Sequence, residues 1–474
     1  ETTEPHGGSS TAWVIALAAA AGGMGWGIRG SYGHETGAMI AGVLIGYVLI
    51  REFLPSATSL KGARVVALLA LGVSFGGSMT YGRTLGLTQA PNAVGDWDAL
   101  RWGLTGVAIK GGVWFGFAGL FLGMGMGRTR YRTLEGLGMV VGMLGLIALG
   151  LWALNEPYDP KLGLYPRWFF SGDWPPPKGP DPTARREVWG GLLFALVGLA
   201  AHARFGRGDR LAGRMAIAGF VAGALGFTVG QSVQAFHAWN RATFQAGGLI
   251  PIDPNLNWWN LMEITFGAVG GAGLAAGLAW NRALIAQDEP ADEVRIAPGW
   301  EIGLAACHAA LIAGAEFSGI PLLGLLLAFG PAAAVIALPA ILGGRFWPYL
   351  FALPIVALPI AGKTLKRLSY ENPDVPIPIG WLAFVAIPLT LLTIAALAFA
   401  QAGRRGGTAR RYGTLALPLT AWLYVALCFS IYQFPWPWSD WNGRTTSTMI
   451  YAACLATLTF AATRPGRVKA TGAE

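Results

Sequence analysis

The sequence contains few charged residues and few cysteines. Asp, Glu, Lys and Arg make up 12% of its 474 residues, about half the share that is typical of soluble domains. Together with 54% hydrophobic residues, this shortage of charge excludes an ordinary soluble globular protein. The three cysteines all lie in apolar runs without metal-site spacing, and the five histidines form no HxxxH or HxH pattern. We therefore expect no metal site and no cofactor.

Long apolar runs recur along nearly the whole chain, each close to the ~20 residues that span a bilayer. We predict an all-α polytopic integral membrane protein that forms a single transmembrane domain over residues 1–474. About fourteen helices are expected, with proline-broken or re-entrant segments between 319 and 361. The expected spans are 12–28, 36–50, 64–83, 102–126, 134–153, 188–204, 213–236, 258–280, 299–316, 319–342, 346–361, 378–401, 412–433 and 446–463. The connections 155–186 and 237–257 are expected to be ordered outer loops that cap the bundle.

Basic residues gather in every second loop. By the positive-inside rule these loops are cytoplasmic, which predicts cytoplasmic termini in a bacterial inner (plasma) membrane. The acidic amino terminus and a basic group at 363–367 disagree with this orientation. Because no basic tract is interleaved with aromatic residues, we expect no nucleic-acid partner. The basic loops contain Arg51, Lys61, Arg64, Arg128, Arg130, Arg132, Arg204, Arg207, Arg210, Arg214, Arg404, Arg405, Arg410, Arg411, Arg464, Arg467 and Lys469.

Glycine is abundant, with 69 residues, and small-xxx-small spacing such as Gly42 and Gly46 lets helix backbones approach closely in a membrane. Residues 64–123 can also be aligned with 214–280. The stretch from Trp102 (WGLTGVAIKGGVWFGFAGLFLG) then pairs with the stretch from Trp259 (WNLMEITFGAVGGAGLAAGLAW). A parallel internal repeat of this kind is typical of some secondary transporters, whose sites lie at the repeat interface.

Lys110 and Glu263 lie inside apolar runs, where charged residues are usually functional. The repeat places them four positions apart on equivalent helices, so we expect similar depth and mutual charge compensation. Two interpretations remain open. In the first, the pair is functional: it binds a coupling ion or substrate, or it relays a proton. In the second, it is a fixed structural ion pair.

A glycine-rich stretch, 22–46, carries Arg29, His34 and Glu35. We expect these residues to line a functional cavity, with Arg29 as a fixed anion clamp and the other two as titrating groups. The alternative is a polar turn between two spans. GWGIRG at 25–30 matches GxGxxG but lacks the βαβ context of a dinucleotide site, which we therefore exclude.

Polar residues at the outer ends of other spans complete the candidate site. The loop 433–446 combines tryptophans with hydrogen-bonding groups, which suits a sugar-like ligand, although an aromatic belt explains the tryptophans alone. The further candidates are Arg83, Gln231, Gln234, Trp438, Asp440, Asn442 and Arg444.

Three functions fit these features. The first is a secondary-active transporter of a small polar organic solute, coupled to protons or sodium and surrounded by membrane lipids. The second is an integral membrane enzyme, a transferase on a lipid-linked substrate, with its site under the outer loops. The third is a non-catalytic membrane scaffold or assembly subunit. We expect a transporter rather than an enzyme, and a homo-oligomer stays open. A site at mid-membrane favours transport, whereas a site at one interface favours an enzyme.

Overall fold

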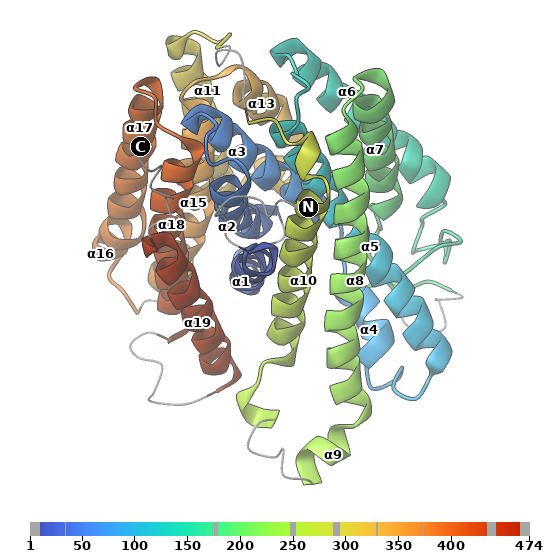
Figure 1. Ribbon diagram of the computed structural model, residues 1–474. Coiled ribbons are helices and arrows are strands. Elements are labelled where there is room, and N and C mark those ends of the chain that lie inside the picture. Colours follow the sequence, from blue (N-terminus) through green and yellow to red (C-terminus); the bar gives the residue numbers. More distant parts are fainter. Residues whose placement is uncertain are drawn as a thin grey trace, which may run out of the picture.

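The structure, a computed structural model, describes residues 10–33, 35–172, 174, 179–246, 253–287, 294–328, 330–372, 374–433 and 442–464. Twelve helices among these residues are long and apolar enough to cross a membrane, which confirms a helical, multi-pass membrane protein (Figure 1). They comprise α1 (Thr11–Arg29), α2 (Glu35–Phe53), α3 (Ser59–Phe75), α5 (Trp97–Met126), α6 (Thr133–Leu154), α7 (Trp189–Ala201), α8 (Arg210–Trp239), α10 (Trp258–Trp280), α14 (Trp347–Leu350) with α15 (Val356–Leu365), α16 (Ile377–Gly380) with α17 (Ile387–Arg404), α18 (Ala409–Gln433) and α19 (Gly443–Thr463).

Two of the expected spans, 299–316 and 319–342, are helical but do not belong to these twelve. The first corresponds to α11 (Pro298–Phe317), whose apolar character is lowered by Glu301, His308 and Glu316. The second is divided into α12 (Pro321–Ala328) and α13 (Gly330–Gly343), each too short to span a bilayer. The count of fourteen is therefore not confirmed.

Glycines bring the central helices into backbone contact. A Cβ atom at Gly22 of α1 would lie 2.2 Å from the carbonyl oxygen of Gly267 in α10. A Cβ at Gly111 of α5 would lie 2.4 Å from the carbonyl oxygen of Gly223 in α8. Since α10 also packs against α8, the order across the centre is α1, α10, α8, α5 (Figure 1). Small residues permit this packing, as they do in other membrane bundles.

The helix beside α5 is broken. After α3, a short turn at Gly76–Ser78 leads to α4 (Gly82–Gln89). Both parts run along α5: Gly76 packs against the ring of Trp114, and Gly103 packs against Thr88. Residues 59–89 thus form one discontinuous helix, with its break level with the middle of the 30-residue α5. Glycine at 76 is required because a Cβ there would lie 2.2 Å from the Trp114 ring.

The connection between α6 and α7 packs against the other half of α5. Trp102 donates a hydrogen bond from Nε1 to the carbonyl oxygen of Phe169 (2.8 Å) and stacks on Trp168, with the ring planes 13° apart. Glu187, at the end of this connection, is buried. The connection therefore brings a carboxylate to α5 that belongs to none of the apolar runs.

Candidate functional site

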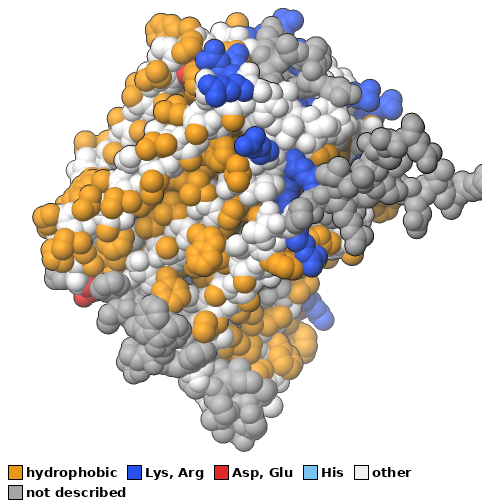
Figure 2. Space-filling model, turned by 60° about the vertical axis from the view of Figure 1, so that its left-hand side comes forward, with side chains coloured by type: hydrophobic (Ala, Val, Ile, Leu, Met, Phe, Trp, Pro, Cys, Tyr) orange, Lys and Arg blue, Asp and Glu red, His pale blue; other side chains and the backbone are white. Residues whose placement is uncertain are grey.

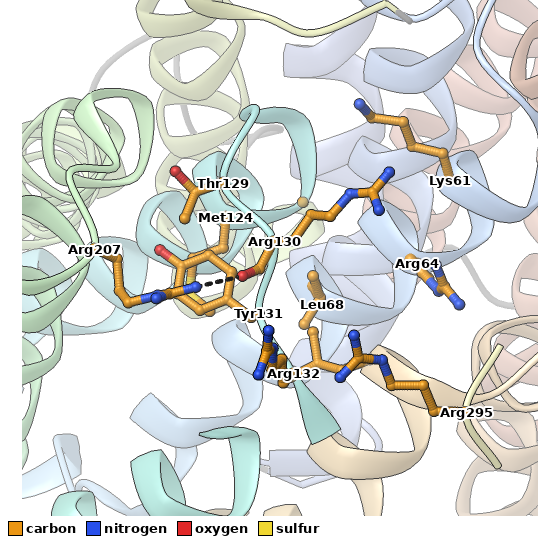
Figure 3. A pocket seen from close by; sticks show the side chains of 12 residues that line it. Lys61, Arg64, Leu68, Met124, Thr129, Arg130, Tyr131, Arg132, Arg207 and Arg295 are labelled. Atoms are coloured by element: carbon orange, nitrogen blue, oxygen red, sulfur yellow. Dashed lines mark hydrogen bonds between the residues drawn. The ribbon is translucent and has the colours of Figure 1, made fainter. Parts of the chain in front are cut away.

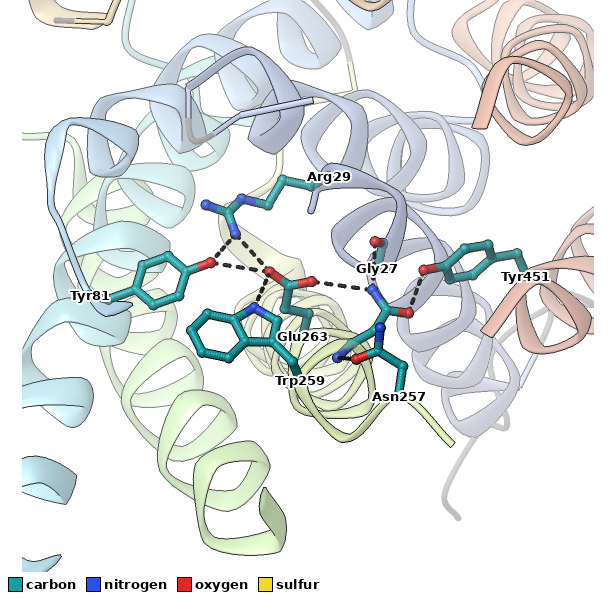
Figure 4. Close-up of polar contacts among 8 residues, drawn as sticks. Gly27, Arg29, Tyr81, Asn257, Trp259, Glu263 and Tyr451 are labelled. Atoms are coloured by element: carbon teal, nitrogen blue, oxygen red, sulfur yellow. Dashed lines mark hydrogen bonds and ion pairs between the residues drawn. The ribbon is translucent and has the colours of Figure 1, made fainter. Parts of the chain in front are cut away.

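Glu263, on the second turn of α10, is the centre of a buried polar cluster (Figure 4). Its Oε1 lies 3.1 Å from Nη1 of Arg29, and it also accepts hydrogen bonds from the Tyr81 hydroxyl (3.1 Å) and from Trp259 Nε1 (3.3 Å). Its Oε2 accepts a hydrogen bond from Asn260 Nδ2 (3.2 Å). Arg29 and Glu263 are only 1% and 3% exposed. We call these five residues the Glu263 network.

Aromatic rings surround the guanidinium of Arg29. Its Cζ lies 5.5 Å from the ring centroid of Trp26 and 5.2 Å from those of Tyr81 and Trp114. Arg29 Nη1 also donates to the Tyr81 hydroxyl. Such cation–π contacts favour a desolvated cation, and Arg29 ends α1, where the helix dipole also favours positive charge. Gly30 permits the close approach, because a Cβ there would lie 2.5 Å from Glu263 Oε2.

Asn260 links the network to two other helices. Its Nδ2 also donates to the carbonyl oxygen of Gly27 in α1 (2.9 Å), and its Oδ1 accepts a hydrogen bond from the hydroxyl of Tyr451 in α19 (2.5 Å). The network therefore fixes α1, α10 and α19 relative to one another, and the broken helix joins them through Tyr81.

A cavity of about 270 Å³ adjoins the network. This volume is just below the usual range of ligand pockets, about 300–1,000 Å³. Carboxylate, guanidinium, amide, hydroxyl and aromatic groups line it together, which is the lining that a small polar molecule requires. The residues are Gly30, Ser31, Asn257, Trp259, Asn260, Glu263, Arg444, Ser447, Thr448 and Tyr451.

Lys110 belongs to a second buried ion pair, with Glu187. Its Nζ lies 2.6 Å from Glu187 Oε1 and donates to Thr84 Oγ1 (2.7 Å) and to the carbonyl oxygen of Thr80 (2.8 Å). Glu187 also accepts a hydrogen bond from the Ser171 hydroxyl (2.9 Å). Both charges of this pair are thus compensated and hydrogen-bonded, as buried charges require.

The expected compensation between Lys110 and Glu263 is therefore wrong. Each residue has another partner, because α1 brings Arg29 to Glu263 and the α6–α7 connection brings Glu187 to Lys110. The two pairs are nevertheless joined by the break in the α3–α4 helix. The carbonyl oxygen of Thr80 accepts from Lys110, and the hydroxyl of the next residue, Tyr81, donates to Glu263.

The other expected site residues are dispersed. Gln231 donates from Nε2 to Thr88 Oγ1 (2.6 Å), so it holds α8 against α4. Gln234 lies one turn further along α8 and is buried, and Arg83 lies on α4. Neither Gln234 nor Arg83 lines the cavity beside Glu263.

Of the residues expected in 433–446, Arg444 lies on the first turn of α19 and lines the cavity, whereas Asn442 caps α19 by accepting a hydrogen bond from the backbone N–H of Arg444 (2.9 Å). Of the remaining expected residues, His34, Trp438 and Asp440 lie outside the described residues. Glu35 begins α2, and its side chain is likewise outside the described part.

A cavity of about 490 Å³ lies at the end of the bundle where α3 begins and α5 ends (Figure 3). Several of its basic side chains connect neighbouring segments: Lys61 donates to the carbonyl oxygen of Ala286 (2.8 Å), and Arg207 donates to that of Arg130 (2.8 Å). Arg207 also pairs with Glu135 at 2.8 Å. These contacts explain part of the basic character structurally. The six basic lining residues are Lys61, Arg64, Arg130, Arg132, Arg207 and Arg295.

Sequence reasoning did not identify Tyr81, Glu187, Asn260 or Tyr451 as site residues. The spacing of Asn260 and Glu263, three positions apart at a helix start, is the one signal that points to a shared polar face. Within the described ranges, no group of three or more His, Cys, Asp or Glu side chains is placed to hold a metal ion. No known family model, curated protein or solved structure matches the chain.

Proposed function

We propose that the chain is a secondary-active transporter of a small polar organic solute, coupled to protons or sodium. One observation carries the proposal: a discontinuous helix joins two buried ion pairs at its break, and a polar cavity adjoins one of them. Discontinuous helices in transporters expose backbone carbonyl groups and helix ends to substrates and coupling ions. Here the break lies level with the middle of α5.

The proposed coupling step is a change of partner at Arg29. Protonation of Glu263, or its engagement by sodium, would weaken the ion pair at 3.1 Å. The guanidinium would then be open to an anionic group of the solute, because an arginine stays charged and presents a planar set of donors. Release of the solute would restore the pair with Glu263. This exchange makes binding of the solute depend on the coupling ion.

The proposed orientation places the basic ends of the helices, and both termini, in the cytoplasm of a bacterial cell. On this orientation the cavity beside Glu263 is in the outer part of the membrane, since Glu263 lies roughly 7 Å along α10 from its outer end. The proposed repeat would relate 64–123 to 214–280. The two ion pairs would then lie on corresponding helices, α5 and α10.

One observation favours a membrane enzyme as the second candidate. The cavity residues Asn257 and Ser447 lie within two turns of the starts of α10 and α19, so the cavity is close to one interface. An enzyme acting on a lipid-linked substrate would need this position, with Glu263 as general base. It would bind a lipid-linked compound rather than a soluble solute.

A ligand screen on the purified protein tests the proposal. Thermal stability is measured with sugars, amino acids, organic acids and a lipid-linked sugar phosphate, because a ligand at 100 times its Kd stabilises the folded state by about 2.7 kcal/mol. We expect one class of soluble solute to stabilise the wild type and the matched control Glu371→Gln, whose carboxylate is exposed. The same solute should stabilise Glu263→Gln at any pH and sodium concentration, because the uncharged carboxamide leaves Arg29 open to the solute. It should not stabilise Arg29→Gln. Stabilisation by the lipid-linked compound alone, or equal stabilisation of Arg29→Gln and the wild type, would contradict the proposal.

A further inference from the structure

Four arginines line a cavity of about 420 Å³ where α2 ends, α18 begins and α19 ends. They are Arg51, Arg410, Arg411 and Arg464, and the described lining contains no acidic residue. We call this the four-arginine cavity. It is separate from the Glu263 network and from the cavity in Figure 3, with which it shares no lining residue.

Arg51 is the buried member, with 7% of its surface exposed. Its Nε is 3.7 Å from Glu52 Oε1, too far for a hydrogen bond. This Nε is buried and has no hydrogen-bond partner within the described part of the chain. Gly413 allows α18 to pack closely against this turn of α2, since a Cβ at position 413 would lie 2.9 Å from the carbonyl oxygen of Tyr47. A buried donor without an acceptor is costly, and Arg51 lines the cavity. An anionic group there would therefore compensate a buried charge that the described chain pairs only at 3.7 Å, with Glu52.

An apolar surface continues from the cavity along α18 and α19. Leu415, Trp422 and Phe460 are 49%, 56% and 51% exposed. The two helices are joined there by a hydrogen bond from Trp422 Nε1 to Thr459 Oγ1 (3.2 Å). The guanidinium Cζ of Arg464 lies 4.2 Å from the centroid of the Phe460 ring, so cation and apolar surface are directly adjacent. Figure 2 shows a broad hydrophobic band on this side of the molecule, with basic side chains beyond its edges.

We propose that the four-arginine cavity binds the phosphate group of an anionic phospholipid, whose acyl chains lie along α18 and α19. Arginine forks match phosphate oxygens in geometry and charge. The start of α18 adds the positive end of a helix dipole to the site. Basic pockets between transmembrane helices bind lipid headgroups in this way. A free phosphate shares the headgroup chemistry, but the adjoining apolar surface is complementary only to a lipid. The inference does not depend on the proposed transport function.

Native mass spectrometry of the full chain released from detergent tests this inference. Phosphatidylglycerol is titrated against phosphatidylcholine, and inorganic phosphate is added in a separate arm. The test variant is Arg410→Gln/Arg411→Gln. The matched control is Arg404→Gln/Arg405→Gln, which removes two exposed arginines at the end of α17 that do not line the cavity.

We expect phosphatidylglycerol to be retained in preference to phosphatidylcholine. Each basic residue near an anionic lipid contributes a factor of about five in binding, so the test variant should bind about 30-fold more weakly. The affinity of the control variant for phosphatidylglycerol should stay within about threefold of that of the wild type. Equal losses of phosphatidylglycerol affinity in the test and control variants would overturn the inference, because they would show only a general attraction between basic residues and anionic lipid. Displacement of the lipid by millimolar inorganic phosphate would overturn the lipid assignment in favour of a soluble phosphate ligand.

Discussion

Breaking the ion pair between Arg29 and Glu263 should cost more stability than removing both of its charges. Glu263→Gln leaves Arg29 charged, 1% exposed and without its carboxylate. Loss of one partner of a buried pair costs about 3–5 kcal/mol, because the other charge stays desolvated and uncompensated. Arg29→Gln should cost a similar amount, since Glu263 would then be the uncompensated charge. The double variant removes both charges and should cost less than either single variant, so it should fall short of the sum of the two single variants by at least about 3 kcal/mol.

The measurement is a double-mutant cycle on unfolding in mixed detergent micelles, followed by the fluorescence of the protein's 20 tryptophans. The control cycle uses Arg101 and Asp98, which pair at 3.2 Å with side chains 75% exposed. Its coupling should be at most about 0.5 kcal/mol, as for other helical surface pairs. If the two Arg29 and Glu263 variants are additive, or if Glu263→Gln alone costs less than about 1 kcal/mol, the buried pair is not coupled as the structure indicates.

Two further predictions concern helix packing and pH. Gly267→Ala places a Cβ 2.2 Å from a backbone oxygen of α1 and should destabilise the protein by about 1–3 kcal/mol. The control Gly138→Ala places its Cβ in open space and should be neutral or slightly stabilising. Equal effects of the two variants on thermal unfolding would refute the described helix packing. Burial raises the pKa of the Asp209 carboxyl group. The folded protein therefore binds a proton at Asp209 more tightly than the unfolded chain does, and the free energy of unfolding should rise as the pH falls from neutral through the folded-state pKa of Asp209. Asp209→Asn should abolish this component while keeping the cap of α8, and an unchanged pH profile of unfolding in the variant would contradict the assignment.

The sequence predicted the helical membrane class because apolar runs report directly on burial in lipid. It also predicted that glycines bring helices together, as Gly22 and Gly267 do. It did not predict the break at Gly76–Ser78. That stretch contains no proline, and its glycines resemble the packing glycines elsewhere in the chain.

The sequence identified Arg29 and Glu263 separately as candidate site residues, but it did not predict that they form an ion pair with each other. Arg29 and Glu263 were identified because charges are rare in apolar runs. Their partnership joins α1 to α10 across more than 230 positions, and nothing local in either run specifies it. Glu187 was missed because it lies in a polar connection, where a carboxylate is ordinary. Only the three-dimensional path of that connection brings Glu187 to Lys110.

Exchange of the screened solute across proteoliposome membranes is the most direct test of the transport proposal. The wild type and Glu371→Gln should show saturable exchange that depends on a proton or sodium gradient. Glu263→Gln, reconstituted to the same density, should exchange the solute without dependence on either gradient, and Arg29→Gln should show no exchange. Binding of the solute by the wild type without any movement across the bilayer would contradict the account.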